Sequence, residues 1–187
     1  MPPKVKITKD DIILSSIELV RMHGEDALNT RAIASYLGCS TQPIFSNFSS
    51  MEELKLTVIN EVCKICNEYT AREIEKREFP IFKAMGMAYI RFAKEEKELF
   101  KLLYMRDRGS EDTSDEDRLS TEDAIAAIQE NISLSYEQAK LFHLEIWAFV
   151  HGIATMLATG FLDLEWELIS KIITDAYCGL KHRYGKE

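Results

Sequence analysis

Apolar residues recur every three or four positions along most of this chain of 187 residues, which is the spacing of one face of an α-helix. The first such segment carries Ile13, Ile17 and Val20 on one face, and Gly24 ends it. No segment shows the strict alternation of apolar and polar residues that marks a half-buried β-strand. The pattern therefore predicts an all-α protein of about nine helices. The expected helices span about residues 8–23, 30–37, 41–47, 51–77, 80–95, 96–107, 121–132, 136–161 and 164–183.

Polar residues mark where several of these helices start. Thr8, Ser50 and Ser135 each stand three residues before an Asp, Glu or Gln, which is the pattern of a capping box or a close variant of it. Thr30 is the predicted N-cap of the second helix, and Ser120 that of the seventh. The chain has only 8 Gly and 4 Pro, so few residues interrupt the helices. This scarcity excludes collagen-like and many-turned β architectures.

Charge is distributed unevenly along the chain. The total is −8, with 23 Lys and Arg against 31 Asp and Glu, and an acidic balance taken by itself disfavours a nucleic-acid partner. The first 50 residues are nevertheless neutral, so the whole excess lies after them. Acidic residues are densest in 111–123, and we predict a solvated acidic loop over 108–119 that runs into the start of the next helix.

The sequence indicates no disulfide framework, metal site or enzyme active site. Four cysteines are too few for a disulfide framework, and no apolar leader opens the chain, so we expect the reducing cytoplasm. Cys63 and Cys66 form a C-x-x-C inside a helical pattern without a second pair, which favours packing over metal binding. No G-x-S-x-G, P-loop or H-E-x-x-H motif occurs. We therefore predict a protein that is not an enzyme and holds no metal or cofactor.

Residues 30–48 form the most informative segment. Two short predicted helices are joined by a turn at Gly38, and Ala34 is small where the second helix must approach the first. Thr41, Gln42 and the pair Ser46–Asn47 are left facing outward, and their short polar side chains suit contact with base edges. The segment predicts a DNA-reading helix-turn-helix, although an ordinary αα-corner has the same local pattern.

The surroundings of this turn resemble a known family. Ile7 to Leu54, with Ala27-Leu-Asn-Thr-Arg, Leu37-Gly-Cys-Ser and Ile44-Phe-Ser-Asn-Phe in register, is similar to the N-terminal DNA-binding domain of TetR-family regulators. The resemblance implies a DNA-binding domain over 1–50, a connecting helix over 51–77 and an effector-binding and dimerisation domain over 78–187. It also implies that an inverted-repeat DNA operator is the partner. The implied DNA-contacting residues are Lys4, Lys6, Lys9, Thr30, Arg31, Ser40, Thr41, Gln42, Pro43, Phe45, Ser46 and Asn47.

Three positions depart from the family pattern. Phe45, Asn47 and Met51 stand where the family usually has Tyr, His and Lys, and no Lys or Arg lies between Arg31 and Lys55. Phosphate contacts are therefore expected from the N-terminal lysines, from Arg31 and from backbone amides. The departures leave a second interpretation open, a helical ligand-binding or protein-interaction module whose DNA contact is degenerate.

The C-terminal half carries a second, shorter likeness. Trp147…His151-Gly152 resembles the Trp…His-Gly signature of one class of TetR C-terminal domains, which bind a small effector and dimerise through their last two helices. The uncharged run 146–162 fits a core or subunit-interface helix, and the mixed aromatic and Met residues suit an apolar effector. Candidate pocket residues are Phe82, Met85, Tyr89, Phe92, Phe100, Tyr104, Phe142, Trp147 and His151. Candidate residues of the homodimer interface are Ala148, Gly152, Thr155, Thr159, Ile169 and Ile173.

Overall fold

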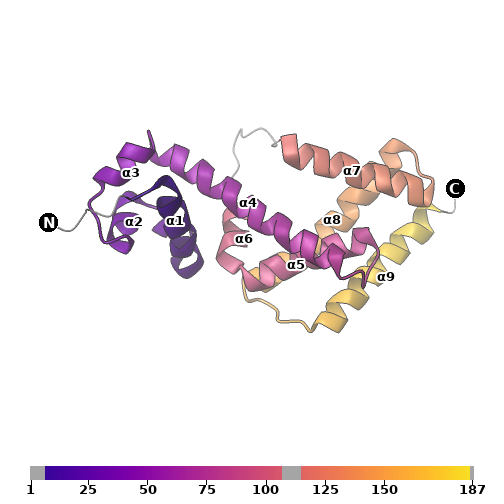
Figure 1. The fold of residues 1–187 in the computed structure, drawn as a ribbon. Coiled ribbons are helices and arrows are strands. Elements are labelled where there is room, and N and C mark those ends of the chain that lie inside the picture. The colour runs from indigo at the N-terminus through magenta and orange to yellow at the C-terminus, as the bar shows by residue number, and fades with distance from the viewer. Residues whose placement is uncertain (1–6, 107–114, 186–187) are drawn as a thin grey trace. The chain divides into compact units, whose positions relative to one another are not determined.

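The computed structural model describes residues 7–106 and 115–185, and within them it contains nine α-helices, one short 3₁₀ segment and no strand (Figure 1). The all-α prediction is confirmed. The helices are α1 (Lys9–His23), α2 (Thr30–Tyr36), α3 (Gln42–Asn47), α4 (Met51–Glu75), α5 (Ile81–Glu95), α6 (Lys97–Tyr104), α7 (Asp115–Ile132), α8 (Tyr136–Ala158) and α9 (Trp166–Tyr184).

Most helix boundaries have the local causes expected from the sequence. At Thr8 and Ser135 the capping box is complete, because the hydroxyl group accepts a backbone N–H and the partner side chain accepts in return. Gly24 ends α1 with a φ of 77°. The N-cap of α2 is Asn29 rather than Thr30, since the Asn29 side chain accepts the N–H of Ala32 at 3.0 Å.

The start of α7 corrects one prediction. The helix begins at Asp115, so part of the predicted acidic loop 108–119 is helical and Ser120 lies inside the helix rather than at its cap. The remainder of that predicted loop up to residue 114 lies outside the described residues. Asp115, Glu116 and Asp117 are the first three residues of the helix. The helix therefore begins earlier in the acidic segment than predicted.

The chain divides into two compact units. The first comprises Met1–Glu68 with Glu95–Arg106, and the second comprises Tyr69–Lys94 with Asp107–Glu187. The boundary falls inside α4, so this one helix contributes residues to both units. The helix α6 belongs to the first unit, although its sequence position lies in the predicted domain 78–187.

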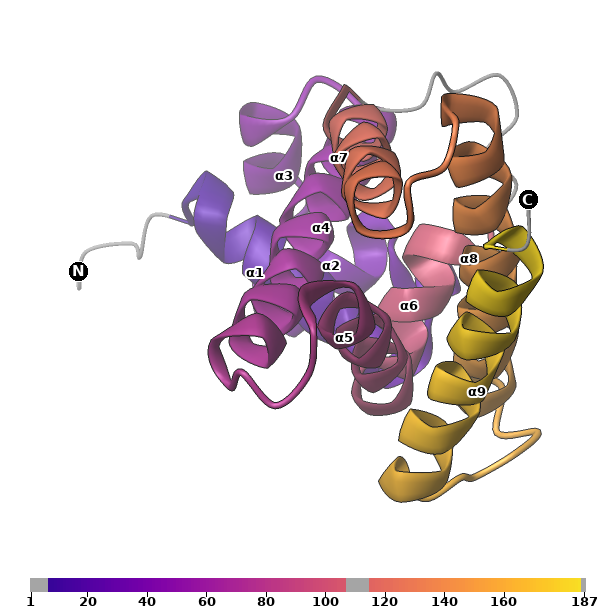
Figure 2. The ribbon, with the colours of Figure 1, turned by 90° about the vertical axis from the view of Figure 1, so that its right-hand side faces the viewer.

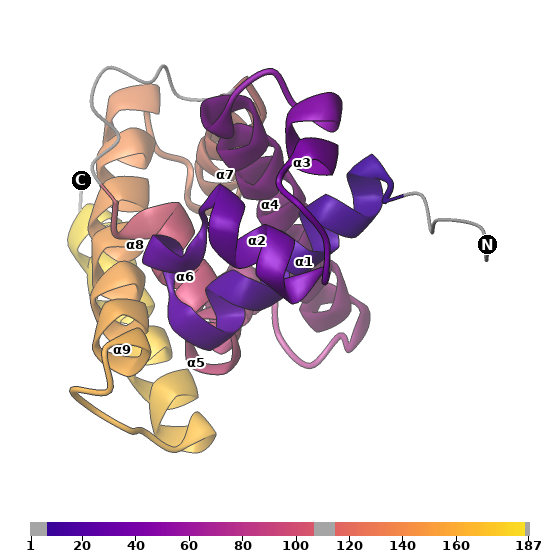
Figure 3. The same ribbon diagram turned by 90° about the vertical axis from the view of Figure 1, so that its left-hand side faces the viewer.

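In the first unit α1 is the central helix. It contacts α2, α3 and α6, and Figure 3 shows α2 and α3 beside it. Its buried face includes Ile12 and Val20, and Ile33 of α2 and Ile44 of α3 are buried with them. Arg21 joins α1 to α6 through two hydrogen bonds to Glu96, at 2.9 and 3.0 Å.

In the second unit α8 packs against α7 and α9, and Figure 2 shows α8 and α9 running side by side. One apolar cluster joins these helices. Phe142 of α8 is fully buried, and its ring centroid lies 5.5 Å from Tyr177 and 5.8 Å from Tyr184 of α9. Ile125 and Ile128 of α7 complete the cluster.

A charged cluster ties the end of α4 to α5 and α9. The carboxylate of Glu73 is buried and accepts from Lys76 at 2.7 Å and from Arg91 at 3.2 Å. Arg91 and Lys94 also stand over the ring of Trp166, at 4.3 and 5.4 Å. These cation–π contacts hold the first residue of α9 against α5.

We expect acid to destabilise the second unit through its partly buried histidines. Burial lowers the pKa of His143 and of His151, so in the folded state both stay neutral at pH values where the unfolded chain binds protons. Stability therefore rises with pH through the ordinary pKa of about 6.5 and is lost as the pH falls below it. Urea unfolding at about pH 7.5 and about pH 5.5 measures the loss. His143→Gln should reduce it, whereas His182→Gln, at an exposed position of α9, should leave it unchanged; equal losses in both variants would contradict the assignment.

Candidate functional site

The helix-turn-helix predicted at residues 30–48 is present. Gly38 adopts the left-handed conformation, with a φ of 63°, and the N–H of Cys39 bonds to the carbonyl of Ala34 at 2.9 Å. Ala34, Ile44 and Phe48 are buried. The turn therefore holds α3 at a fixed angle to α2 and leaves one face of α3 toward solvent.

The exposed face of α3 carries Gln42, Phe45 and Ser46, while Thr41 and Asn47 at its ends are half-buried. Two predicted base-reading donors are occupied within the helix. The Ser46 hydroxyl donates to the carbonyl of Gln42 at 2.9 Å, and the Asn47 amide donates to the carbonyl of Pro43 at 2.7 Å. Each keeps an oxygen that can accept, and Asn47 also keeps one amide N–H. Because Thr41 and Asn47 are half-buried, the exposed Gln42 is the most accessible donor among these polar side chains.

A surface hollow of about 430 Å³ separates α3 from the start of α2, and we call it the α2–α3 hollow. Four of the predicted DNA-contacting residues meet there, together with Asn29, which the sequence analysis missed. Its signal was its residue type, because asparagine is among the preferred N-cap residues and stands directly before Thr30, the predicted cap. The hollow is lined by Asn29, Thr30, Arg31, Thr41 and Phe45. It combines one cation, several hydrogen-bonding side chains and one aromatic ring.

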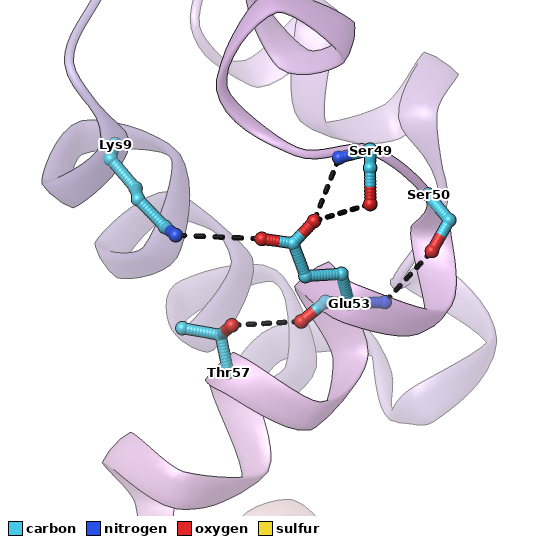
Figure 4. Close-up of polar contacts among 5 residues, drawn as sticks. All are labelled: Lys9, Ser49, Ser50, Glu53 and Thr57. Carbon is cyan, nitrogen blue, oxygen red and sulfur yellow. Dashed lines mark hydrogen bonds and ion pairs between the residues drawn. The ribbon is translucent and has the colours of Figure 1, made fainter.

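Lys9 has a partner inside the protein (Figure 4). Its Nζ lies 3.6 Å from the carboxylate of Glu53 and 4.7 Å from the ring centroid of Phe48. The same carboxylate accepts the N–H of Ser49 at 2.8 Å and its hydroxyl at 2.6 Å, while the hydroxyl of Ser50 accepts the N–H of Glu53. The hydrogen bonds from Ser49, and then Lys9, lower the pKa of Glu53. Lys9 therefore braces the α3–α4 junction. Lys4 and Lys6 lie outside the described residues.

Met51 takes the place of a cation at the start of α4. The hydroxyl of Thr30 donates to the sulfur of Met51 at 3.0 Å, so the first residue of α2 is joined to the first residue of α4. A thioether is only a weak acceptor and carries no charge. At this position the chain has a contact within the protein in place of a phosphate-binding ammonium group.

Three of the predicted pocket residues meet in the second unit. The hydroxyl of Tyr89 lies 2.8 Å from Nδ1 of His151, and Nε2 of the same ring lies 3.4 Å from the hydroxyl of Thr155. Trp147 stacks on His151, with ring centroids 5.0 Å apart and planes 11° apart. Burial lowers the pKa of His151, which keeps the imidazole neutral at pH 7. The group therefore offers an aromatic surface beside an uncharged polar network.

The other predicted pocket residues are dispersed. Phe92 and Phe142 are fully buried in the second unit, where Phe82 packs on Tyr177 at 5.8 Å between ring centroids and Met85 is half-buried. Phe100 and Tyr104 belong to the first unit and pack on each other. The structure thus places several of these aromatics in core packing, which has the same helical spacing as a pocket wall. Tyr177 and Tyr184, seven residues apart on one face of α9, were not among the pocket candidates, and both pack on Phe142.

One long face of α8 has no partner within the described chain. Ala148 and Thr159 are exposed, and Gly152 and Thr155 are half-buried, so the predicted stripe of small residues lies at the surface beside Leu144, which is 55% exposed. By length and composition α8 could span a membrane, and 39% of its most apolar window is buried. Ile169 and Ile173, by contrast, are buried in the chain's own core, which leaves them no surface for a partner.

Comparisons with known proteins agree with these features. Residues 82–172 match the profile of the family described as "Tetracyclin repressor-like, C-terminal domain". An uncharacterized HTH-type transcriptional regulator of Mycobacterium tuberculosis is 24% identical over 165 residues, which cover 84% of this chain and 73% of the relative.

Two solved structures from Rhodococcus sp. RHA1 share the fold over nearly the whole chain. A protein of unknown function superposes with a TM-score of 0.74 at 20% identity, covering 98% of this chain and 97% of that one. A TetR-like transcriptional regulator superposes with a TM-score of 0.67 at 15% identity, covering 96% and 98%.

Proposed function

We propose that this chain is a transcriptional regulator of the TetR-like family, as its similarity to such proteins supports. In this proposal it is a repressor that binds an inverted-repeat operator as a homodimer. It leaves the operator when a small apolar or amphipathic effector binds. The observation that carries the proposal is the exposed face of α3 beside the α2–α3 hollow. Gln42 faces outward on that helix, and Arg31 and two hydroxyl groups line the hollow next to it. This arrangement offers a base-reading side chain and a phosphate-binding cation on one surface.

The direct test is selection of bound fragments from the host genome, with and without candidate effectors. Enrichment of a two-fold symmetric sequence whose half-sites lie one helical turn apart, about 34–36 Å, or a multiple of it, supports the proposal. If no sequence is enriched, the second interpretation is favoured, a helical binding module with degenerate DNA contact. Two observations support this second interpretation: the uncharged Met51 at the start of α4, and the ion pair between Lys9 and Glu53. For either activity we propose a cytoplasmic protein without catalysis.

Gln42→Ala is expected to relax specificity at one position of each half-site. A glutamine bidentate to adenine discriminates against the wrong base by about 1–3 kcal/mol, so the variant should lose that preference and keep the others. Competition binding with operator variants changed at one base pair measures the difference.

Arg31→Ala provides the matched comparison for Gln42→Ala. A phosphate contact contributes about equally on every sequence, so this variant should weaken all operators together. The slope of log affinity against log salt concentration should also become shallower by about 0.9 for each phosphate that the variant no longer neutralises. Lys6→Ala should behave in the same way. If the Gln42 and Arg31 variants act alike on every sequence, the division between base and phosphate contacts is incorrect.

For dimerisation, the exposed face of α8 is the supporting feature. Small residues at Ala148 and Gly152 permit a second helix to approach closely, and apolar side chains such as Leu144 flank them. In a homodimer of two-fold symmetry this patch would meet its own copy. Two α3 helices would then be presented in the inverted orientation that a palindromic operator requires.

For effector binding, the group of Tyr89, Trp147 and His151 is the supporting feature. An effector that binds there must favour one conformation of the protein, and α4, which contributes to both units, is the element able to transmit the difference. A coupling of about 1–3 kcal/mol gives a roughly 5–150-fold loss of operator affinity, and operator DNA must weaken the effector by the same factor. Effector dissociation constants measured through Trp147 fluorescence, with and without operator, test this; equal constants would leave a regulator without this switch.

A further inference from the structure

The α3 helix exposes the phenyl ring of Phe45 at a position where the TetR-like pattern usually has a tyrosine, whose hydroxyl can donate a hydrogen bond. Phe45 is 59% exposed, and it lies on the same solvent face as Gln42 and Ser46. Single exposed apolar residues are ordinary on a protein surface, so exposure alone says little. Here, however, the ring also forms one wall of the α2–α3 hollow. It lies on α3, the helix that reads the operator in the proposed function.

The chemistry of Phe45 restricts what can cover it. A phenyl ring has no donor for a phosphate oxygen, and placing it against the anionic backbone would remove water from that anion without replacing a hydrogen bond. The groups that can donate to a phosphate are instead Arg31 and Thr41 on other walls of the hollow, since the hydroxyl of Thr30 already donates to Met51. In the major groove, the C5-methyl group of thymine is the apolar group that a base pair presents, and phenylalanine is one of the side chains that contact it.

The hydrogen bonds within α3 point the same way. Ser46 donates its hydroxyl, and the half-buried Asn47 one of its two amide N–H groups, to carbonyl groups of the helix itself. The central, exposed part of the reading face is then reduced to Gln42, which reads by hydrogen bonding, and Phe45, which reads by apolar contact. We propose, on the basis of the proposed operator binding, that Phe45 determines specificity by recognising the C5-methyl group of a thymine in each half-site.

Replacing thymine by deoxyuridine removes only that methyl group, which makes it the appropriate probe. With the selected operator in hand, each thymine is replaced in turn. We expect one position per half-site at which the wild-type protein binds about fourfold more weakly, the factor given by about 0.8 kcal/mol per buried methyl-sized group. Replacement in both half-sites should weaken binding about 15-fold, the product of two such factors. With cytosine at that position, 5-methylcytosine should bind about fourfold better than cytosine.

Two variants separate this role from a general one. In Phe45→Ala, deoxyuridine at that position should no longer change the affinity, whereas in Gln42→Ala the fourfold effect should remain. Both residues are surface-exposed, so both variants are expected to fold, which circular dichroism checks. The proposal is overturned if deoxyuridine is silent at every thymine, or if its effect is the same in Phe45→Ala as in the wild type. Failure of the fragment selection itself would instead overturn the proposed operator binding.

Discussion

Gly152→Leu is expected to convert the proposed homodimer to a monomer. A Cβ atom at Gly152 would meet no other described atom within 4 Å, so the subunit has room for the leucine and should fold normally. In a close α8–α8 contact the same side chain would fill space that the partner helix needs, and overpacking of this kind costs about 1–3 kcal/mol at each copy. Sedimentation at micromolar concentration measures the change. Gly152→Ala should remain dimeric, and so should Ala126→Leu, which adds leucine at an exposed position of α7.

Loss of the dimer should also abolish tight operator binding. Two linked reading heads bind with an avidity that exceeds that of one head by roughly 10²–10⁴, and the monomer forfeits this factor. Operator affinity of Gly152→Leu should therefore fall by at least about 100-fold, while binding to a single half-site stays close to that of the wild type. A wild-type protein that sediments as a monomer, or a Gly152→Leu protein that stays dimeric, would contradict the proposal that α8 forms the dimer interface.

Phe142→Ala is expected to cause the largest loss of stability from a single substitution. The side chain is fully buried and lies between two tyrosines of α9, and the cluster continues into α7. Truncation of such a phenylalanine costs about 3–5 kcal/mol, because the transfer free energy is lost and a cavity remains. Urea unfolding at fixed protein concentration measures it. Ile81→Ala, at an exposed position of the same unit, should cost less than about 0.5 kcal/mol; similar losses in both variants would show that the cluster does not hold the unit together.

The features that could be predicted from the sequence are those with a local cause. The capping boxes at Thr8 and Ser135 and the left-handed turn at Gly38 each depend on residues within one turn of the chain, and the structure confirms all three. The start of α7 was misplaced because acidic residues suit both a solvated loop and the first turn of a helix. The local pattern did not distinguish these two structures.

What could not be predicted depends on contacts between distant residues. Lys9 and Glu53 are 44 positions apart, so no pattern indicated that this lysine would be paired rather than available for phosphate. In the same way, a stripe of apolar residues has one spacing whether it lines a pocket, a core or a dimer interface. Phe92, Phe142 and Ile169 all fit the helical stripe, and their complete burial follows only from how the second unit packs.

The brace at Lys9 has a consequence for how the protein would search the genome. Of the cations described in residues 7–50, Lys9 and Arg21 each lie beside a carboxylate whose negative charge offsets part of their attraction for DNA of arbitrary sequence. Sliding along a duplex depends on that non-specific attraction, and so does electrostatic acceleration of encounter. A regulator built in this way would rely less on sliding and more on free diffusion and repeated collision, and its association rate would change less with ionic strength than that of a more basic relative.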